Sequence, residues 1–145
     1  MPRIRQFRRE DLDRVLELAN SCAAFDGETS EADLAITSTF PQGFLVAEDG
    51  GRVVGFAYSY FREVPIEVLE RWKARKVGTL VLMVVDPRSR KKGIGTSLLR
   101  ATFKALKGAG ADMVLLDCPS EATDARKLYE KTGFEVRARS MKKRL

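Results

Sequence analysis

Residues 84–99 read VVDPRSRKKGIGTSLL, and this stretch combines three features within a few residues. An apolar strand ends at Asp86-Pro87, four positive charges follow within five residues, and Gly93 and Gly95 open a helical pattern. Backbone N–H groups at the start of a helix bind anions, and glycine lets a ligand approach the backbone closely. The combination indicates a bound phosphate. A tight turn with a solvated basic surface is the alternative that this stretch alone leaves open.

The segments on either side of this stretch predict a strand–helix–strand unit. Residues 80–85 are continuously apolar, as in a strand covered on both faces, and residues 113–116 predict a second buried strand. Between them, apolar residues recur at helical spacing as far as the glycines at positions 108 and 110. Two strands joined in this way run parallel in one sheet.

The rest of the chain predicts one mostly antiparallel sheet and several helices. A hairpin is predicted for residues 44–48 and 52–60, because the turn between them reads Asp-Gly-Gly. The further predictions are a strand at 3–7, a helix from 12 to 22, short helices within 23–43 and 61–76, a helix ending near residue 133, and one or two strands in 134–145. The fold class is α+β with an α/β centre, in a single domain over residues 1–145.

Composition narrows the chemistry. The chain has 145 residues, of which 44% are hydrophobic and 32% charged, as in an ordinary soluble globule. It has no histidine, which removes the usual general base and the commonest zinc ligand, so we expect no metal. Cys22 and Cys118 are expected to be free thiols. Because no signal peptide and no membrane-spanning run is present, we expect a cytoplasmic protein with no membrane partner.

Positive charge is concentrated after residue 87. Residues 88–145 carry 15 Lys and Arg against 6 Asp and Glu, whereas residues 1–87 carry 11 against 14. Such a surface could attract nucleic acid, an anionic membrane or a phosphorylated small molecule, and charge alone does not choose among them.

Two motifs resemble the GNAT superfamily of N-acetyltransferases. Arg90-x-x-Gly93-x-Gly95, after a strand that ends in V-x-P, is similar to the pyrophosphate loop of that family. Residues 125–134, ARKLYEKTGF, are similar to its A-x-x-L-Y-x-x-x-G-F motif. The resemblance implies a central mixed sheet of six or seven strands with helices on both faces. It also implies that the strands at 80–85 and 113–117 splay apart and that acetyl-CoA lies between them.

The resemblance also implies roles for particular residues. The pyrophosphate would be bound by Arg90, Lys91, Lys92, Gly93, Ile94, Gly95 and Thr96. The backbone of Met83, Val84 and Val85 would pair with the pantetheine arm and polarise the acetyl carbonyl. Tyr129 would donate a proton to the leaving thiolate, unless it is a core tyrosine, and Asp117 is the candidate base, unless it caps a turn.

The implied reaction is acetyl transfer from acetyl-CoA to a primary amine, which could be a protein N-terminus, a lysine or a small-molecule amine. We expect direct attack in a ternary complex, because Cys118 has no histidine to activate it as a nucleophile. The alternatives are a non-catalytic CoA-binding sensor and a basic module that binds nucleic acid. Of these the nucleic-acid module is the less favoured, and family habit suggests a homodimer.

Overall fold

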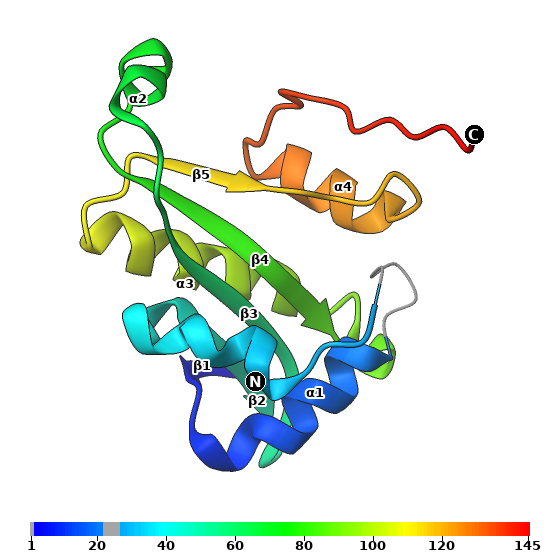
Figure 1. Ribbon diagram of the computed structural model, residues 1–145. Helices are drawn as coiled ribbons and strands as arrows, with labels where there is room; N and C mark the ends of the chain where they lie inside the picture. The colour runs from blue at the N-terminus through cyan, green and yellow to red at the C-terminus, as the bar shows by residue number, and fades with distance from the viewer. Residues whose placement is uncertain (1, 22–26) are drawn as a thin grey trace.

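The computed structural model describes residues 2–21 and 27–145, and its centre is one five-stranded sheet (Figure 1). Cys22 lies outside the described residues. The strands are β1 (Arg3–Gln6), β2 (Phe44–Asp49), β3 (Arg52–Arg62), β4 (Val77–Val85) and β5 (Met113–Leu116). The α-helices are α1 (Leu12–Asn20), α2 (Ile66–Trp72), α3 (Ile94–Gly108) and α4 (Thr123–Lys131). Short 3-10 helices are η1 (Arg9–Asp11), η2 (Glu31–Thr39), η3 (Pro41–Gly43) and η4 (Pro87–Ser89).

The strand order is β1-β2-β3-β4-β5, with antiparallel pairing throughout except between β4 and β5, which run parallel. The predicted hairpin is confirmed as β2–β3. Gly50 and Gly51 turn the chain with φ of 59° and 77°, the positive values that a tight hairpin turn requires.

Helices α1 and α3 cover opposite faces of the sheet, as the alternation of side chains along β3 shows. Phe56 and Tyr58 pack in a buried cluster with Val15 and Leu18 of α1, which we call the α1 cluster. Ala57, which lies between them, packs instead with Leu98 of α3 in the α3 cluster. Successive residues of a strand point to opposite faces, so each helix buries one side of the same strand.

The splay between β4 and β5 is confirmed. Their pairing runs from Val77 opposite Met113 to Leu80 opposite Leu116 and then stops. Strand β4 continues to Val85, and Figure 1 shows it diverging from the chain that follows β5. Among the described residues, the second half of β4 therefore has no strand partner on this side.

The structure corrects several details of the predicted sheet. Residues 134–145 form no strand, so the sheet of the described residues has five strands rather than six or seven. Apolar and polar residues do alternate in this segment, but a strand also needs a partner, and Val136 and Met141 are instead 68% and 92% exposed. Strand β5 is half-buried rather than buried, because it lies at the edge of the sheet. Val81 of β4 is 41% exposed, so the α1 face is uncovered there.

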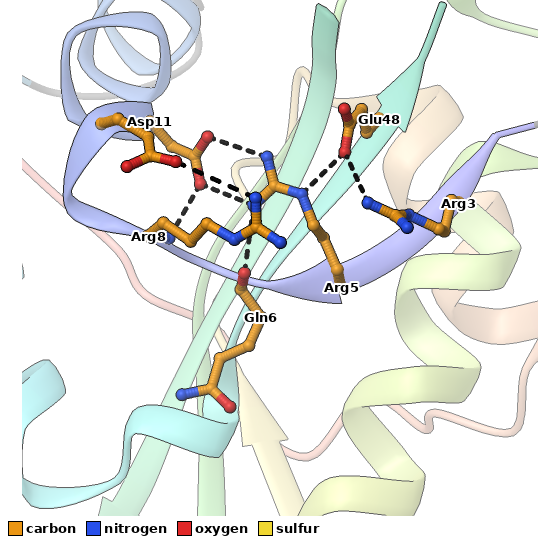
Figure 2. Close-up of polar contacts among 7 residues, drawn as sticks. Arg3, Arg5, Gln6, Arg8, Asp11 and Glu48 are labelled. Atoms are coloured by element: carbon orange, nitrogen blue, oxygen red, sulfur yellow. Dashed lines mark hydrogen bonds and ion pairs between the residues drawn. The ribbon is translucent and has the colours of Figure 1, made fainter. Parts of the chain in front are cut away.

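Strand β1 is tied to the start of α1 by an ion-pair cluster (Figure 2). The guanidinium of Arg5 donates to both carboxylate oxygens of Asp11 at 2.8 and 2.9 Å, and its Nε donates to Glu48 of β2 at 2.7 Å. Asp11 also accepts from the backbone N–H of Arg8 at 2.8 Å. The hydrogen bond from Arg5 is the largest cause that holds the pKa of Asp11 below its usual range.

Candidate active site

The basic loop after β4 begins at Asp86, whose carboxylate accepts hydrogen bonds from two sides. One oxygen accepts from the backbone N–H of Arg88 at 3.0 Å, which caps η4. The other accepts from Nη2 of Arg14 in α1 at 2.6 Å, and Nε of Arg14 donates to the carbonyl of Val53 at 3.0 Å. These bonds, that from Arg88 foremost, hold the pKa of Asp86 below its usual range. Arg14 thus ties the start of the loop to α1 and β3.

The loop then presents backbone N–H groups next to exposed cations. Lys91 and Gly93 adopt left-handed conformations with φ of 64° and 78°, which cost glycine little but cost a lysine about 1–2 kcal/mol. Within the part of the chain that the structure describes, the N–H groups of Lys91, Lys92 and Gly93 donate to no protein acceptor. They lie directly before α3, whose dipole favours an anion, and the side chains of Arg90, Lys91 and Lys92 are exposed.

The two glycines of the loop have different structural reasons. A Cβ on Gly93 would meet no atom of the described part of the chain within 4 Å, so the left-handed conformation is what requires glycine there, and the space beside it is open. A Cβ on Gly95 would lie 3.0 Å from Cδ2 of Leu128, so the missing side chain lets α4 pack against the first turn of α3. The sequence predicts that both glycines admit a ligand. In this structure Leu128 occupies the space beside Gly95.

The two remaining residues of the predicted loop lie in the first turn of α3. Ile94 is buried in the α3 cluster, so its backbone rather than its side chain is available to a ligand. Thr96 is half-buried in the same turn.

Met83, Val84 and Val85 lie on the part of β4 with which no strand in residues 2–21 or 27–145 pairs on the β5 side. On the other side all three pair with β3. Val84 packs in the α1 cluster, whereas Met83 and Val85 pack against the α3 cluster. An extended amide-bearing chain could hydrogen-bond to this open backbone edge as an added strand does.

The two predicted catalytic side chains flank the splay from opposite faces of the sheet. Asp117 directly follows β5 and is exposed, and it lines a hollow of about 200 Å³ that also contains Tyr60 of β3. Tyr60 shares the α1 face with Tyr58, since their ring centroids are 6.3 Å apart. Tyr129 is half-buried against the α3 cluster, and its ring lies edge-on to Phe134 with centroids 5.8 Å apart. The structure therefore brings both residues to the splay but not into one pocket.

Sequence reasoning missed two features of this region. The ion pair between Arg14 and Asp86 joins residues 72 positions apart, and no local pattern signals it. Arg62, at the end of β3, lines the same hollow as Asp117. Strand alternation places Arg62 on the same face as Tyr60. The sequence does not indicate that Asp117, at the end of β5, lies on that face too.

Cys118 is half-buried beside these residues, and its burial raises the pKa of its thiol. A thiol that stays protonated is a weak nucleophile. Its Sγ lies 3.6 Å from the carbonyl oxygen of Pro119 and 3.8 Å from that of Ala122.

Comparisons with known proteins agree with this geometry. The model of the acetyltransferase (GNAT) family matches residues 12–134. An N-alpha-acetyltransferase of Sulfurisphaera tokodaii is 30% identical, over 92% of this chain and 80% of the relative. A mycothiol acetyltransferase of Thermobispora bispora is 32% identical over 65% of this chain, but the match spans 30% of that longer protein.

The solved structures extend the match to the fold. Naa20 of Chaetomium thermophilum, solved in complex with a bisubstrate analogue, superposes with a TM-score of 0.77 at 26% identity, over 92% of this chain and 71% of the other. The family match covers the open β4 edge, the basic loop and the helix that carries Tyr129. The chain therefore belongs to the acetyltransferase (GNAT) family, and it is an enzyme that transfers an acetyl group from acetyl-CoA to an amine.

Proposed function

We propose that the amine attacks the thioester directly, in a ternary complex, at the point where β4 and β5 separate. The observation that carries this proposal is the placement of Asp117 and Tyr129 on opposite faces of the sheet at the splay. An acceptor can then approach from the Asp117 face while the thiolate leaves toward the Tyr129 face. Asp117 accepts a proton from the amine and Tyr129 donates a proton to the leaving thiolate, and the two side chains act from opposite faces of the sheet.

The proton balance assigns each side chain one task. Asp117 holds the incoming ammonium group and takes its proton, directly or through water, so that the neutral nitrogen can attack the carbonyl carbon. Backbone N–H groups along 83–85 would stabilise the oxyanion that forms. The attacking nitrogen loses its second proton to water as the carbonyl re-forms, and as the carbon–sulfur bond breaks, Tyr129 donates its phenolic proton to the thiolate. The phenolate then regains a proton from solvent.

The residues of the loop fit the diphosphate of acetyl-CoA. The N–H groups of Lys91, Lys92 and Gly93 have no protein acceptor within the described residues, and the space beside Gly93 is open. Arg90 and the two lysines add exposed positive charge at the same place. The diphosphate would supply the acceptor atoms that these donors lack.

An acyl-enzyme is not part of this proposal. Burial raises the pKa of the Cys118 thiol, and the chain contains no histidine that could deprotonate it. Initial-rate kinetics with varied acetyl-CoA and amine should therefore give intersecting double-reciprocal lines, whereas parallel lines would indicate a covalent intermediate.

The catalytic roles are tested by measuring thiol release with acetyl-CoA and a panel of amines. Tyr129→Phe should leave CoA affinity unchanged and lower kcat about 10²-fold, the usual contribution of one general acid. Asp117→Asn should lower kcat/KM for the amine by a similar factor, with a smaller loss at high pH, where more of the amine is neutral. Cys118→Ser is the matched control and should retain activity. Normal turnover of Tyr129→Phe would remove the acid assignment.

The donor site is tested separately by calorimetry with CoA. Replacing Arg90 by Ala together with Gly93→Val removes a cation and forces a branched residue into a left-handed conformation. Binding should weaken at least tenfold, whereas Arg100→Ala, an exposed change elsewhere on α3, should bind normally. Tight CoA binding without thiol release for any amine would favour a CoA sensor instead.

The acceptor class, a cytoplasmic location and a homodimer stay predictions. A protein α-amine has a pKa near 8 and is about a tenth neutral at pH 7, whereas a lysine side chain, with a pKa near 10.4, is almost fully protonated and depends far more on the base to remove its proton.

No helix of the described residues is long and apolar enough to cross a membrane.

A further inference from the structure

The hollow beside Asp117 contains two opposite charges that have no partner among the residues that the structure describes. It is lined by Tyr60, Arg62, Thr79, Leu80, Val81 and Asp117. Within residues 2–21 and 27–145, neither Arg62 nor Asp117 makes an ion pair or a side-chain hydrogen bond, with each other or with any neighbour. Glu63 follows Arg62 directly but does not pair with it. Both charges are therefore available to a ligand.

The register of the sheet sets how far apart these charges lie. Arg62 pairs with Val77 of β4, whereas Asp117 follows Leu116, which pairs with Leu80. Their backbones are thus separated by roughly 13 Å along the strands and by about 10 Å across two strand spacings. The long Arg62 side chain shortens this span, but a free α-amino acid, whose ammonium and carboxylate share one carbon, is too short to meet both charges.

The size of the hollow indicates that it takes the end of a longer molecule. About 200 Å³ is less than the roughly 300–1,000 Å³ of pockets that enclose a whole small ligand. The half-exposed side chain of Val81 gives its floor an apolar surface, and Thr79 adds a hydroxyl. A peptide amino terminus presents an amine, an apolar first side chain and further groups at one-residue intervals, in this order.

We propose that the acceptor is a peptide amino terminus that carries a carboxylate side chain within its first few residues. The α-amine lies at Asp117, and the acidic side chain lies at Arg62, whose planar guanidinium can bind a carboxylate through two parallel hydrogen bonds. This assignment rests on the proposed amine-acetyltransferase function and adds the acceptor class to it. Arg62 is a binding residue that sets specificity and takes no part in the proton transfers.

The test compares peptides that differ at one position. Two acceptors, Ala-Glu and Ala-Gln followed by the same neutral residues, have almost equal size but differ by one charge, and an Ala-Lys peptide has the opposite charge. The glutamate peptide should have a kcat/KM about tenfold above that of the glutamine peptide, as expected for one exposed charge-assisted hydrogen bond. The lysine peptide should be the poorest acceptor. Raising the salt concentration should reduce the preference.

A charge reversal at Arg62 provides the decisive variant. Arg62→Glu should abolish the preference for the glutamate peptide or reverse it toward the lysine peptide, with unchanged CoA affinity. Arg62→Lys should keep the preference in weakened form. Arg52→Glu makes the same change in charge at the other end of β3, outside the hollow, and should behave as the wild type. A mere loss of folding would lower the activity toward all three peptides equally.

The outcomes separate this inference from the proposed function. Thiol release with polyamines or with the side-chain amine of lysine, but not with acidic amino termini, would overturn the acceptor assignment. The proposed transfer of an acetyl group to an amine would then still stand. Equal rates for all three peptides, or an Arg62→Glu variant with wild-type preference, would also overturn it. No thiol release with any amine would overturn both.

Discussion

The ion pair between Arg14 and Asp86 is expected to stabilise both the fold and the loop that binds the diphosphate. Nη2 of Arg14 lies 2.6 Å from Oδ2 of Asp86, and the two side chains are 18% and 12% exposed. Arg14→Ala leaves the Asp86 carboxylate and the carbonyl of Val53 without this donor. Removing one member of a fully buried ion pair lowers the free energy of unfolding by about 3–5 kcal/mol, and leaving a buried neutral group without its hydrogen-bond partner lowers it by about 1–3 kcal/mol. For this partly exposed pair we expect Arg14→Ala to lower the free energy of unfolding by about 2 kcal/mol.

A second arginine of the same chain supplies the control. Arg9 and Glu31 also approach to 2.6 Å, but their side chains are 79% and 56% exposed. Water screens such a pair, so Arg9→Ala should cost at most about 0.5 kcal/mol. The two variants thus compare equal distances at different burial.

Thermal unfolding followed by circular dichroism measures this difference. With a loss of about 3 °C per kcal/mol, Arg14→Ala should lower Tm by about 6 °C and Arg9→Ala by less than about 2 °C. Because Asp86 also caps η4, Arg14→Ala should weaken CoA binding as well. Equal Tm losses for the two variants would show that burial does not strengthen the Arg14–Asp86 pair, and a normal CoA affinity in Arg14→Ala would show that the pair does not position the loop.

The hydrogen bond from Arg5 lowers the pKa of Asp11 in the folded state. The stabilisation that this bond gives is present above the unfolded pKa of about 3.9 and is lost as the pH falls below it. The difference in the free energy of unfolding between the wild type and Asp11→Asn, measured in urea, should therefore shrink from pH 7 to pH 3. Gly95→Val should lower the free energy of unfolding by about 2 kcal/mol, because the larger side chain displaces Leu128. Gly95→Ala should leave it nearly unchanged, because the better helix propensity of alanine offsets the tight contact. Urea unfolding measures both changes. Calorimetry should show that CoA affinity falls several-fold between low and high salt, since the cations at 90–92 are exposed.

Local patterns predicted the elements that form through neighbouring residues. The hairpin turn follows from Gly50 and Gly51, which take the positive φ values that a two-residue turn requires. The strand–loop–helix at 77–108 follows from an apolar run, a proline stop and a helical repeat. The resemblance to the GNAT family gave the splay and the placement of the loop, because both depend on motifs of fixed spacing.

Patterns that depend on a distant partner were predicted less well. The alternation in residues 134–139 indicates a strand, but the pattern does not specify which edge it pairs with, and the segment forms no strand in the structure. Residues 31–39 form a 3-10 helix, for which the 3.6-residue period gives no signal, and residues 22–26 lie outside the described residues.

The site shows the same limit. Loop residues such as Gly93 are recognisable from a contiguous motif. Arg14 and Arg62 reach the site from α1 and β3, and their relevance depends on which strand pairs with which. Neither arginine lies in a sequence motif that would distinguish a residue of the site from any other charged residue.

The proposed catalytic mechanism requires the backbone N–H groups around Gly93 to bind the diphosphate of acetyl-CoA, and amide NMR can measure this binding residue by residue. In a ¹⁵N-labelled sample titrated with CoA, the amide signals of residues 91–95 should show the largest shifts, and pantetheine, which lacks the diphosphate, should leave them in place. Unchanged amide signals at 91–95 in the presence of saturating CoA, with shifts elsewhere, would show that CoA binds without these N–H groups.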